Sequence, residues 1–504
     1  MPNYLYDFLL SSHLNDSRLF LQQPDGKSIT YRGFLELASS QAHVLARSGM
    51  TPGDRLIVQA DKSFEALGLY AACIMTGIVL IPLNTAYTLT ELAYYLDDGD
   101  VRGIVCCSET ASSLEEAIRK PDLAIFTLNA DGSGSLMDEA RRQRRQFTVV
   151  DRMPNDLAAI LYTSGTTGRS KGAMLTHANL LSNAQALKQL WQFTSDDVLL
   201  HALPLSHIHG LFIACNVMLL AGGTILFLPK FDLDQVFEML PEATSMMGVP
   251  TFYDRLLNDA RLTRDAAARI RVFISGSAPL RSETFDAFEQ RTGHCILERY
   301  GMTETNITAS NPYNGERRAG TVGLPVPGVE LIITDPETGE PLAKGETGMI
   351  EVRGPGIFAG YWRMPEKTDA ELRQNGFFIT GDIGKLDANG YVHIVGRAKD
   401  LIISGGLNVY PEEIELLLDA QPGILESAVV GVSHLDFGEA VLGIVVPVPG
   451  VSPDLELISK TISASLANFK RPKKLVLMEE LPRNAMGKVQ KALLREKFKS
   501  VFSE

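Results

Sequence analysis

Short apolar runs alternate with helix-like segments along the first 150 residues of the chain. Brief apolar runs that end at turn-forming residues predict buried strands, here at residues 28–31, 55–60, 78–83 and 103–107. The helix-like patterns lie at residues 31–48, 63–77 and 89–96. Thr88 and Glu91 predict a capping box at the start of the last of these helices. Strands that alternate with helices predict a parallel sheet covered by helices.

The second half of the chain has a different pattern. Residues 321–400 are rich in strand-like runs, and residues 387–390 have the composition of a hairpin turn. The pattern then predicts a helix at 412–419, strands at 426–432 and 441–448, and a helix at 455–467. A chain of 504 residues is too long for one compact core, so we expect at least two domains.

One polar stretch follows the apolar run at residues 157–161. It contains Thr163, Ser164, Gly165, Thr166, Thr167, Gly168 and Lys171. Glycines let backbone N–H groups approach an anion closely, the hydroxyl groups add donors, and Lys171 adds a positive charge. This chemistry is typical of a loop that holds a polyphosphate, although the order of residues is not that of a Walker loop. A generic cluster of this composition is more often a solvated turn.

Two further segments carry small or polar residues. Residues 203–210 include His207 and His209, whose spacing puts them on different faces of a helix and argues against a helical metal site. Loop histidines that pack on their neighbours are the plainer interpretation. Residues 272–280 are a predicted strand that runs into the small residues Gly276, Ser277 and Ala278. Such a turn would let a flat ring lie against the backbone, and it is otherwise an ordinary strand-to-helix turn.

Residues 298–305 combine an aromatic ring, a glycine turn, two threonines and an acid. Tyr300 suits stacking on a base, Thr303 suits a hydrogen bond to a phosphate, and the Glu304 carboxylate is a ligand of the kind that Mg²⁺ takes. Taken alone, Glu304 is more simply a surface acid.

Composition narrows the class of protein. With 47 basic and 60 acidic residues the net charge is −13, which argues against a general nucleic-acid or anionic-membrane binder. Five cysteines without CxxC spacing disfavour disulfide frameworks and zinc sites. No apolar run is long enough for a membrane helix, and the first 20 residues do not resemble a secretion or mitochondrial targeting signal. We therefore expect a cytoplasmic enzyme.

The order Ser-Gly-Thr-Thr-Gly-x-x-Lys-Gly at residues 164–172, followed by the motif at residues 298–305, resembles the adenylate-forming superfamily of acyl-CoA synthetases, luciferases and peptide-synthetase adenylation domains. The resemblance covers essentially the whole chain. It implies an α/β fold whose large N-terminal domain has helix-covered sheets and a small barrel-like β part, followed by a small α+β domain. It also implies ATP, Mg²⁺ and coenzyme A, with Glu304 as the metal ligand. The nucleotide-binding residues that it implies are Thr163, Ser164, Gly165, Thr166, Thr167, Lys171, Gly276, Ser277, Ala278, Glu298, Arg299, Tyr300, Gly301, Thr303, Asp382, Arg397 and Lys488.

The same resemblance assigns roles near the end of the chain. Lys399 matches the hinge of the family, so we expect domains at residues 1–397 and 398–504, the second one mobile. The loop of Ser404, Gly405 and Gly406 would face coenzyme A. Lys488 matches the catalytic lysine, which joins Glu304, Thr303 and His207 in the implied catalytic set. The segment around Lys488 also resembles one in which related synthetases are acetylated, so a lysine acetyltransferase is an expected partner.

The acid that is activated is a narrower question. Residues 203–212, 248–255, 275–280 and 299–306 resemble the malonyl-CoA synthetases of this superfamily. The resemblance implies that Arg255 holds the second carboxylate of malonate, because a buried unpaired charge is costly and a guanidinium matches a carboxylate. The other implied pocket residues are His207, Ile208, Ser277, Met302 and Ile307. The bulk of Ile208, Met302 and Ile307 would set the tolerance of the pocket for methylmalonate. Two alternatives stay open: a CoA ligase for another small carboxylic acid, such as acetate, oxalate or an aryl acid, or an enzyme that loads an acyl group onto a carrier protein.

Overall fold

The computed structural model describes residues 3–117, 122–163, 170–404, 407–434, 437–484 and 487–502. The chain divides into two compact units. The first consists of Met1–Leu331 and Val352–Phe378, and the second of Ile332–Glu351 and Ile379–Glu504. Strands at residues 379–397 thus belong to the second unit, and the predicted boundary of a mobile domain after Arg397 stays a prediction.

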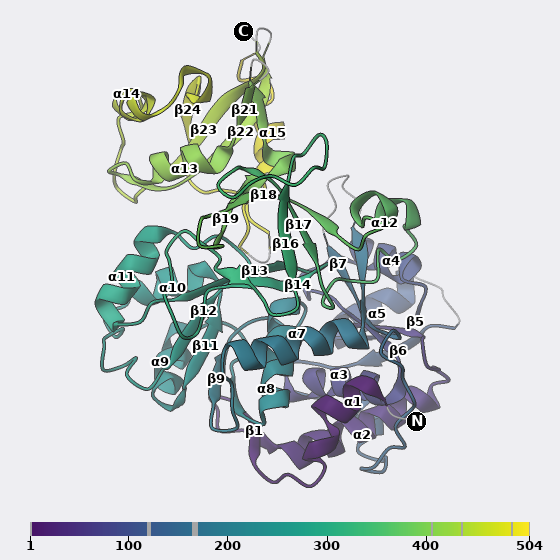
Figure 1. Ribbon diagram of the computed structural model, residues 1–504. Coiled ribbons are helices and arrows are strands. Elements are labelled where there is room, and N and C mark those ends of the chain that lie inside the picture. Colours follow the sequence, from purple (N-terminus) through teal and green to yellow (C-terminus); the bar gives the residue numbers. More distant parts are fainter. Residues whose placement is uncertain are drawn as a thin grey trace. The chain divides into compact units, whose positions relative to one another are not determined.

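A six-stranded sheet of the first unit contains the predicted βα repeats (Figure 1). Its order is β6-β5-β3-β4-β7-β8, and all neighbours are parallel except β7 and β8. The strands are β3 (Arg55–Gln59), β4 (Val79–Pro82), β5 (Val101–Cys106), β6 (Ala124–Thr127), β7 (Leu157–Thr163) and β8 (Lys171–Thr176). The helices of this part of the chain are α1 (Tyr4–Leu9), α2 (Tyr31–Arg47), α3 (Phe64–Thr76), α4 (Leu89–Asp98), α5 (Ser108–Ala117) and α6 (Ser135–Ala140).

A nine-stranded sheet makes up the rest of the first unit, in the order β15-β14-β13-β12-β11-β9-β10-β1-β2. Its inner strands are parallel, and its two ends are antiparallel. The strands are β1 (Leu19–Gln22), β2 (Ser28–Thr30), β9 (Val198–His201), β10 (Thr224–Phe227), β11 (Ser245–Gly248), β12 (Val272–Ser275), β13 (Leu297–Met302), β14 (Asn306–Ser310) and β15 (Leu324–Pro325). The helices are α7 (His177–Leu190), α8 (Asn216–Ala221), α9 (Leu233–Met239), α10 (Pro250–Leu257), α11 (Ser282–Thr292) and α12 (Pro365–Glu371).

The second unit is built from two smaller sheets. A four-stranded sheet has the order β16-β17-β18-β19, and a five-stranded sheet has the order β21-β20-β23-β22 with β24 beside β23. The strands are β16 (Glu330–Thr334), β17 (Gly348–Arg353), β18 (Phe378–Leu386), β19 (Val392–Arg397), β20 (Ile402–Ser404), β21 (Leu407–Val409), β22 (Ile424–His434), β23 (Gly438–Pro447) and β24 (Lys474–Leu477). The helices are α13 (Pro411–Asp419), α14 (Leu455–Ser465) and α15 (Lys491–Lys497).

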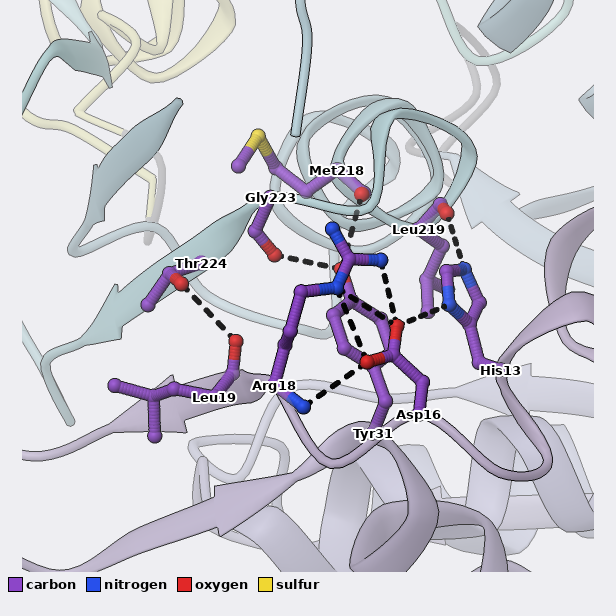
Figure 2. A network of polar contacts seen from close by, with 9 residues as sticks. All are labelled: His13, Asp16, Arg18, Leu19, Tyr31, Met218, Leu219, Gly223 and Thr224. Atoms are coloured by element: carbon purple, nitrogen blue, oxygen red, sulfur yellow. Dashed lines mark hydrogen bonds and ion pairs between the residues drawn. The ribbon is translucent and has the colours of Figure 1, made fainter. Parts of the chain in front are cut away.

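The N-terminal segment is joined to the large sheet by a polar network (Figure 2). His13 Nε2 lies 2.9 Å from the Leu219 carbonyl oxygen, and the Tyr31 hydroxyl donates to the Gly223 oxygen at 2.6 Å. Asp16 accepts from Arg18, which holds the pKa of that carboxyl well below its ordinary value. These bonds hold the N-terminal segment against the residues that lead into β10, and β1 pairs in parallel with that strand, while β2 forms the edge of the sheet.

Local signals in the sequence agree with these elements. Thr88 and Glu91 form the predicted capping box, and Thr176 caps α7 in the same way. Helix α10 begins at Pro250, after Val249, because proline suits the first helical position. No helix in the described ranges is both long and apolar enough to cross a bilayer.

Candidate active site

The predicted phosphate loop connects two antiparallel strands. β7 and β8 pair from Leu157 with Thr176 to Thr163 with Lys171, so the two ends of the loop lie side by side. Ser164, Gly165, Thr166 and Thr167 lie outside the described residues. Lys171 is the first residue of β8, and its pairing with Thr163 in β7 fixes its position.

Lys171 and Glu304 meet around one tyrosine that the sequence did not single out. The Tyr361 hydroxyl lies 3.1 Å from Glu304 Oε1 and 2.7 Å from Glu371 Oε2. Lys171 Nζ lies 3.4 Å from the same hydroxyl and 3.6 Å from Glu371. Thr163 Oγ1 lies 3.4 Å from Glu304 Oε1. The structure thus joins the predicted phosphate-binding lysine to the predicted metal-binding acid.

Burial determines the protonation of this cluster. Tyr361 is 2% exposed and Glu304 is 4% exposed. Burial and the negative charges of Glu304 and Glu371 raise the pKa of Tyr361, so its hydroxyl stays a donor. Burial alone would raise the pKa of Glu371, but hydrogen bonds from Lys367 and Tyr361 outweigh it and lower that pKa. Glu371 therefore carries charge beside Lys171.

The predicted acyl-pocket residues lie where β9, β12 and β13 end. His207 precedes a π-helical turn, His209–Cys215, so His209 is not in a simple loop. His209 is fully buried, and its Nδ1 lies 3.3 Å from Ser277 Oγ. Ser277 has φ +74°, a left-handed conformation that is rare for serine. Ile208 and Ile307 are both buried, as walls of a small pocket would be.

The motif at residues 298–305 spans the end of β13. Arg299 is 4% exposed, and its guanidinium lies against Gly276, where an added Cβ would be 2.5 Å from Cζ. Glu298 accepts a hydrogen bond from the Leu280 backbone nitrogen at 3.0 Å. Tyr300 and Thr303 are half-buried. The strand therefore brings Glu298 and Arg299 next to the turn that contains Ser277.

Arg255 lies in a different environment. It is exposed on α10, and its guanidinium lies 6.0 Å from the centre of the Phe231 ring. Within the described ranges its side chain makes no hydrogen bond or ion pair. It lines a surface hollow together with Phe231, Asp232, Leu233, Asp234 and Arg261. The structure does not bring Arg255 into polar contact with His207 or Ser277.

The second unit holds the remaining predicted residues. Asp382 is 2% exposed, and its Oδ1 lies 2.6 Å from Arg397 Nε across the β18–β19 pair. Lys399 lies in the short turn Ala398–Asp400, directly after β19. Ser404 is buried at the end of β20, whereas Gly405 and Gly406 lie outside the described residues.

Lys488 follows Gly487, whose φ of +75° suits a tight turn. The Lys488 backbone nitrogen donates to Asn484 Oδ1 at 2.9 Å. Desolvation lowers the pKa of the Lys488 ammonium to about 8, and repulsion from Arg397 adds to this shift. Part of the Lys488 side chain stays exposed to solvent, so its ammonium is only partly desolvated. Repulsion from Arg397 therefore contributes to the lowered pKa besides desolvation.

Comparison with known proteins defines the class. Residues 13–362 match the AMP-binding enzyme family, and residues 413–488 match the AMP-binding enzyme C-terminal domain. The chain therefore belongs to the AMP-binding enzyme family, and the resemblance seen in the sequence is confirmed. The predicted α/β fold, with a large and a small domain, is confirmed as well.

Particular relatives resemble the chain over most or all of its length. The crystal structure of ATP-bound MatB from Rhodopseudomonas palustris has 51% sequence identity and a TM-score of 0.97, covering 100% of both chains. A malonate–CoA ligase from Arabidopsis thaliana is 35% identical over 98% of this chain and 84% of its own length. A long-chain-fatty-acid–CoA ligase from Bacillus subtilis is 32% identical over 94% of this chain and 90% of its own.

Proposed function

We propose that this protein is an ATP-dependent malonate–CoA ligase. It would convert malonate, ATP and coenzyme A into malonyl-CoA, AMP and pyrophosphate. The similarity to a malonate–CoA ligase along 98% of the chain is the observation that carries the proposal, and the polar cluster around Tyr361 supports the ATP chemistry. The relative that acts on long-chain acids is more distant in identity, at 32%.

The reaction has two steps. In the first, a carboxylate oxygen of malonate attacks the α-phosphorus of ATP, the bond to the bridging oxygen breaks, and pyrophosphate leaves. In the second, the thiolate of coenzyme A attacks the acyl carbon of malonyl-adenylate, and AMP leaves with the bonding electron pair. The thiol proton passes to solvent or to a base.

Residues of the first unit suit the first step. Lys171 would bind the β- and γ-phosphates, because its ammonium lies at the end of the strand that follows the phosphate loop. Transfer to a phosphorus centre depends mainly on positioning and on charge stabilisation, so a mobile cation there lowers the barrier. His207 would lie beside the reacting carboxylate, and Ser277 would line the same pocket.

A magnesium ion fits the donor set of the first unit. The described residues contain no group of three or more acids, histidines or cysteines, so the protein by itself does not form a full cage. Mg²⁺ is usually bound by one or two carboxylates together with substrate phosphates and water. The buried Glu304 carboxylate provides such a ligand, and the ion would neutralise charge on the leaving pyrophosphate.

Residues of the second unit suit nucleotide binding and the change from adenylation to thioester formation. The Asp382 carboxylate would accept hydrogen bonds from both ribose hydroxyls, and its ion pair with Arg397 would orient it. Lys488 would bridge the attacking carboxylate and the α-phosphate. Rotation about Lys399 would then remove Lys488 and admit the thiol, with Ser404 on the side of coenzyme A.

The test is pyrophosphate release with MgATP across a panel of small acids, with and without coenzyme A. The panel is malonate, methylmalonate, succinate, acetate, propionate, oxalate, benzoate and octanoate. We expect the highest kcat/KM for malonate and AMP formation that depends on coenzyme A. Preference for a monocarboxylate would refute the malonate assignment. Adenylation that ignores free coenzyme A would favour loading of a carrier protein.

A further inference from the structure

Lys62 joins the two sheets of the first unit. It follows β3 of the six-stranded sheet, and its Nζ lies 2.6 Å from Nδ1 of His201, the last residue of β9 in the nine-stranded sheet. The same ammonium donates to the His201 carbonyl oxygen at 2.8 Å and lies 4.4 Å from the centre of the Phe227 ring. No carboxylate of the described residues forms an ion pair with it. Desolvation therefore lowers the pKa of the Lys62 ammonium well below its ordinary value.

His201 is neutral, and its contacts define which ring nitrogen carries the proton. The residue is 0% exposed, and desolvation, together with the charge of Lys62, lowers the pKa of the ring to about 3. Nε2 lies 2.8 Å from the Gly210 carbonyl oxygen, which can only accept, so Nε2 carries the proton and donates. Nδ1 is then an acceptor, and Lys62 is the donor that faces it.

The Gly210 carbonyl belongs to the π-helical turn His209–Cys215. Such turns are rare and are frequently found at functional sites. The Gly210 oxygen also accepts from the Cys215 thiol at 3.2 Å. A Cβ at Gly210 would collide with the Pro204 carbonyl oxygen, so the chain is packed closely at this point. The bond from His201 therefore helps to fix where this part of the turn lies.

The same turn holds both histidines of the predicted acyl pocket. The backbone nitrogen of Leu211, the residue after Gly210, donates to the His207 carbonyl oxygen at 3.0 Å. His209 immediately precedes Gly210, and its Nδ1 lies 3.3 Å from Ser277 Oγ. A shift of the Gly210 carbonyl would therefore move both His207 and His209.

We propose that Lys62 is a positioning residue for the carboxylic acid that the enzyme activates, and that it acts through His201 on the π-helical turn beside His207. The inference rests on the proposed function, in which His207 lies beside the reacting carboxylate. The N–H bond of Lys62 holds His201 in the tautomer that donates to Gly210. Without Lys62, either Nδ1 is a buried acceptor with no donor, or the proton moves to Nδ1 and two acceptors face each other at Gly210, and both arrangements cost free energy.

The test measures pyrophosphate release with varied malonate at saturating MgATP, and with varied MgATP at saturating malonate. Lys62→Met keeps the length of the side chain and removes its donor. We expect it to lower kcat/KM for malonate by about 10- to 100-fold, because a positioning error of about 1 Å can have an effect of that size. We expect KM for MgATP to stay within about twofold of the wild-type value, because the turn does not belong to the phosphate-binding cluster.

Two substitutions of His201 separate the proposed chain of hydrogen bonds from simple packing. His201→Gln offers an amide N–H near the place of Nε2, so it should keep kcat/KM for malonate within about fivefold of wild type. His201→Asn offers its amide near the place of Nδ1, where it can accept from Lys62 but cannot reach Gly210, so it should behave like Lys62→Met. Adding Lys62→Met to His201→Asn should cost less than about twofold more, because both substitutions break the same connection to Gly210. The two His201 variants also keep the test decisive if Lys62→Met does not fold.

Nitrogen-15 spectra of histidine-labelled enzyme measure the tautomer directly. We expect neutral His201 with its proton on Nε2 in the wild type at neutral pH. The matched control is Tyr31→Phe, which removes a buried hydrogen bond to the Gly223 carbonyl oxygen elsewhere in the first unit, and it should leave KM for malonate unchanged.

Three results would each overturn the inference: a proton on Nδ1 of His201 in the wild type, equal rises of KM for malonate and for MgATP in Lys62→Met, or fully additive losses in the double variant. A wild type that prefers a monocarboxylate would overturn the proposed function instead. The role of Lys62 is then tested with the preferred acid in place of malonate, so the two failures are distinguishable.

Discussion

The Tyr361 hydroxyl is the feature of the candidate site whose removal tests the site most directly. It lies between the acid expected to bind Mg²⁺ and the acid that pairs with Lys171, at 3.1 Å from Glu304 and 2.7 Å from Glu371. Tyr361→Phe deletes one oxygen and keeps the ring, so the edge contact with Phe358 at 4.8 Å is retained. The substitution therefore isolates the hydrogen bonds.

The size of the effect follows from the partners. A hydrogen bond to a charged group contributes about 1.5–3 kcal/mol, and its loss in a buried site leaves a carboxylate under-solvated. The hydroxyl has one proton, so it donates to one carboxylate at a time and the two bonds do not add. We expect kcat/KM for MgATP to fall by about 10- to 150-fold, at about 1.4 kcal/mol for each factor of ten.

The assay is pyrophosphate release at saturating malonate with varied MgATP and varied free Mg²⁺. The concentration of Mg²⁺ needed for half-maximal rate should rise, because Glu304 loses the donor that orients it. Thioester formation from supplied malonyl-adenylate should change little. The matched control is Tyr70→Phe, which removes another buried hydroxyl, one that donates to Asn216 Oδ1 at 3.0 Å. A Tyr361→Phe enzyme with unchanged Mg²⁺ dependence, or one no different from the control, would refute this account of the cluster.

Other predictions concern single residues. Lys488→Ala should suppress pyrophosphate release by about 10²–10³-fold while largely sparing thioester formation from supplied adenylate. Acetylation of Lys488 should have the same effect, because it removes the positive charge. Equal loss of both steps would contradict a role in adenylation alone. Because the pKa of Lys488 is lowered to about 8, its charged form is lost as the pH rises through that value, so adenylation should decline there in a pH–rate profile. Lys399→Pro should impair thioester formation more than adenylation, since proline fixes φ, and a variant with both half-reactions intact would argue against a hinge. Tyr31→Phe, which leaves the Gly223 oxygen without its 2.6 Å donor, should lower the free energy of unfolding by about 1–3 kcal/mol in urea titrations, with adenylation per folded molecule unchanged.

Much of the fold could be predicted from local pattern. Helices α2 and α3 and strands β3, β4 and β5 lie within a few residues of the predicted ranges, because each is encoded by a run of neighbouring side chains. The capping box at Thr88 depends on residues three apart in sequence. The π-helical turn that begins at His209 was not predicted, because its hydrogen bonds depend on how the segment packs rather than on a local signal.

The candidate site was predicted only in part. Lys171, Glu304, Asp382 and Lys488 are predicted from motifs whose order is characteristic of a family, and their roles stay predictions. Tyr361 and Glu371 were missed, because an aromatic and an acid ten residues apart have no pattern of their own. Tyr361 joins the site only through its tertiary contact with Glu304, which lies 57 positions away in the sequence. Glu371 joins it through its hydrogen bond with Tyr361.

The sequence by itself determined the family, the order of the elements and the chemical types of residue available for adenylation. The tertiary structure decided which of these residues meet, and how strongly each charge acts there. Arg255 and Arg299 show the difference, since the same guanidinium is in one case exposed to solvent and in the other buried at 4% exposure against Gly276. The strength of a charge depends on how much water surrounds it, and burial is a property of packing between segments that are distant in sequence.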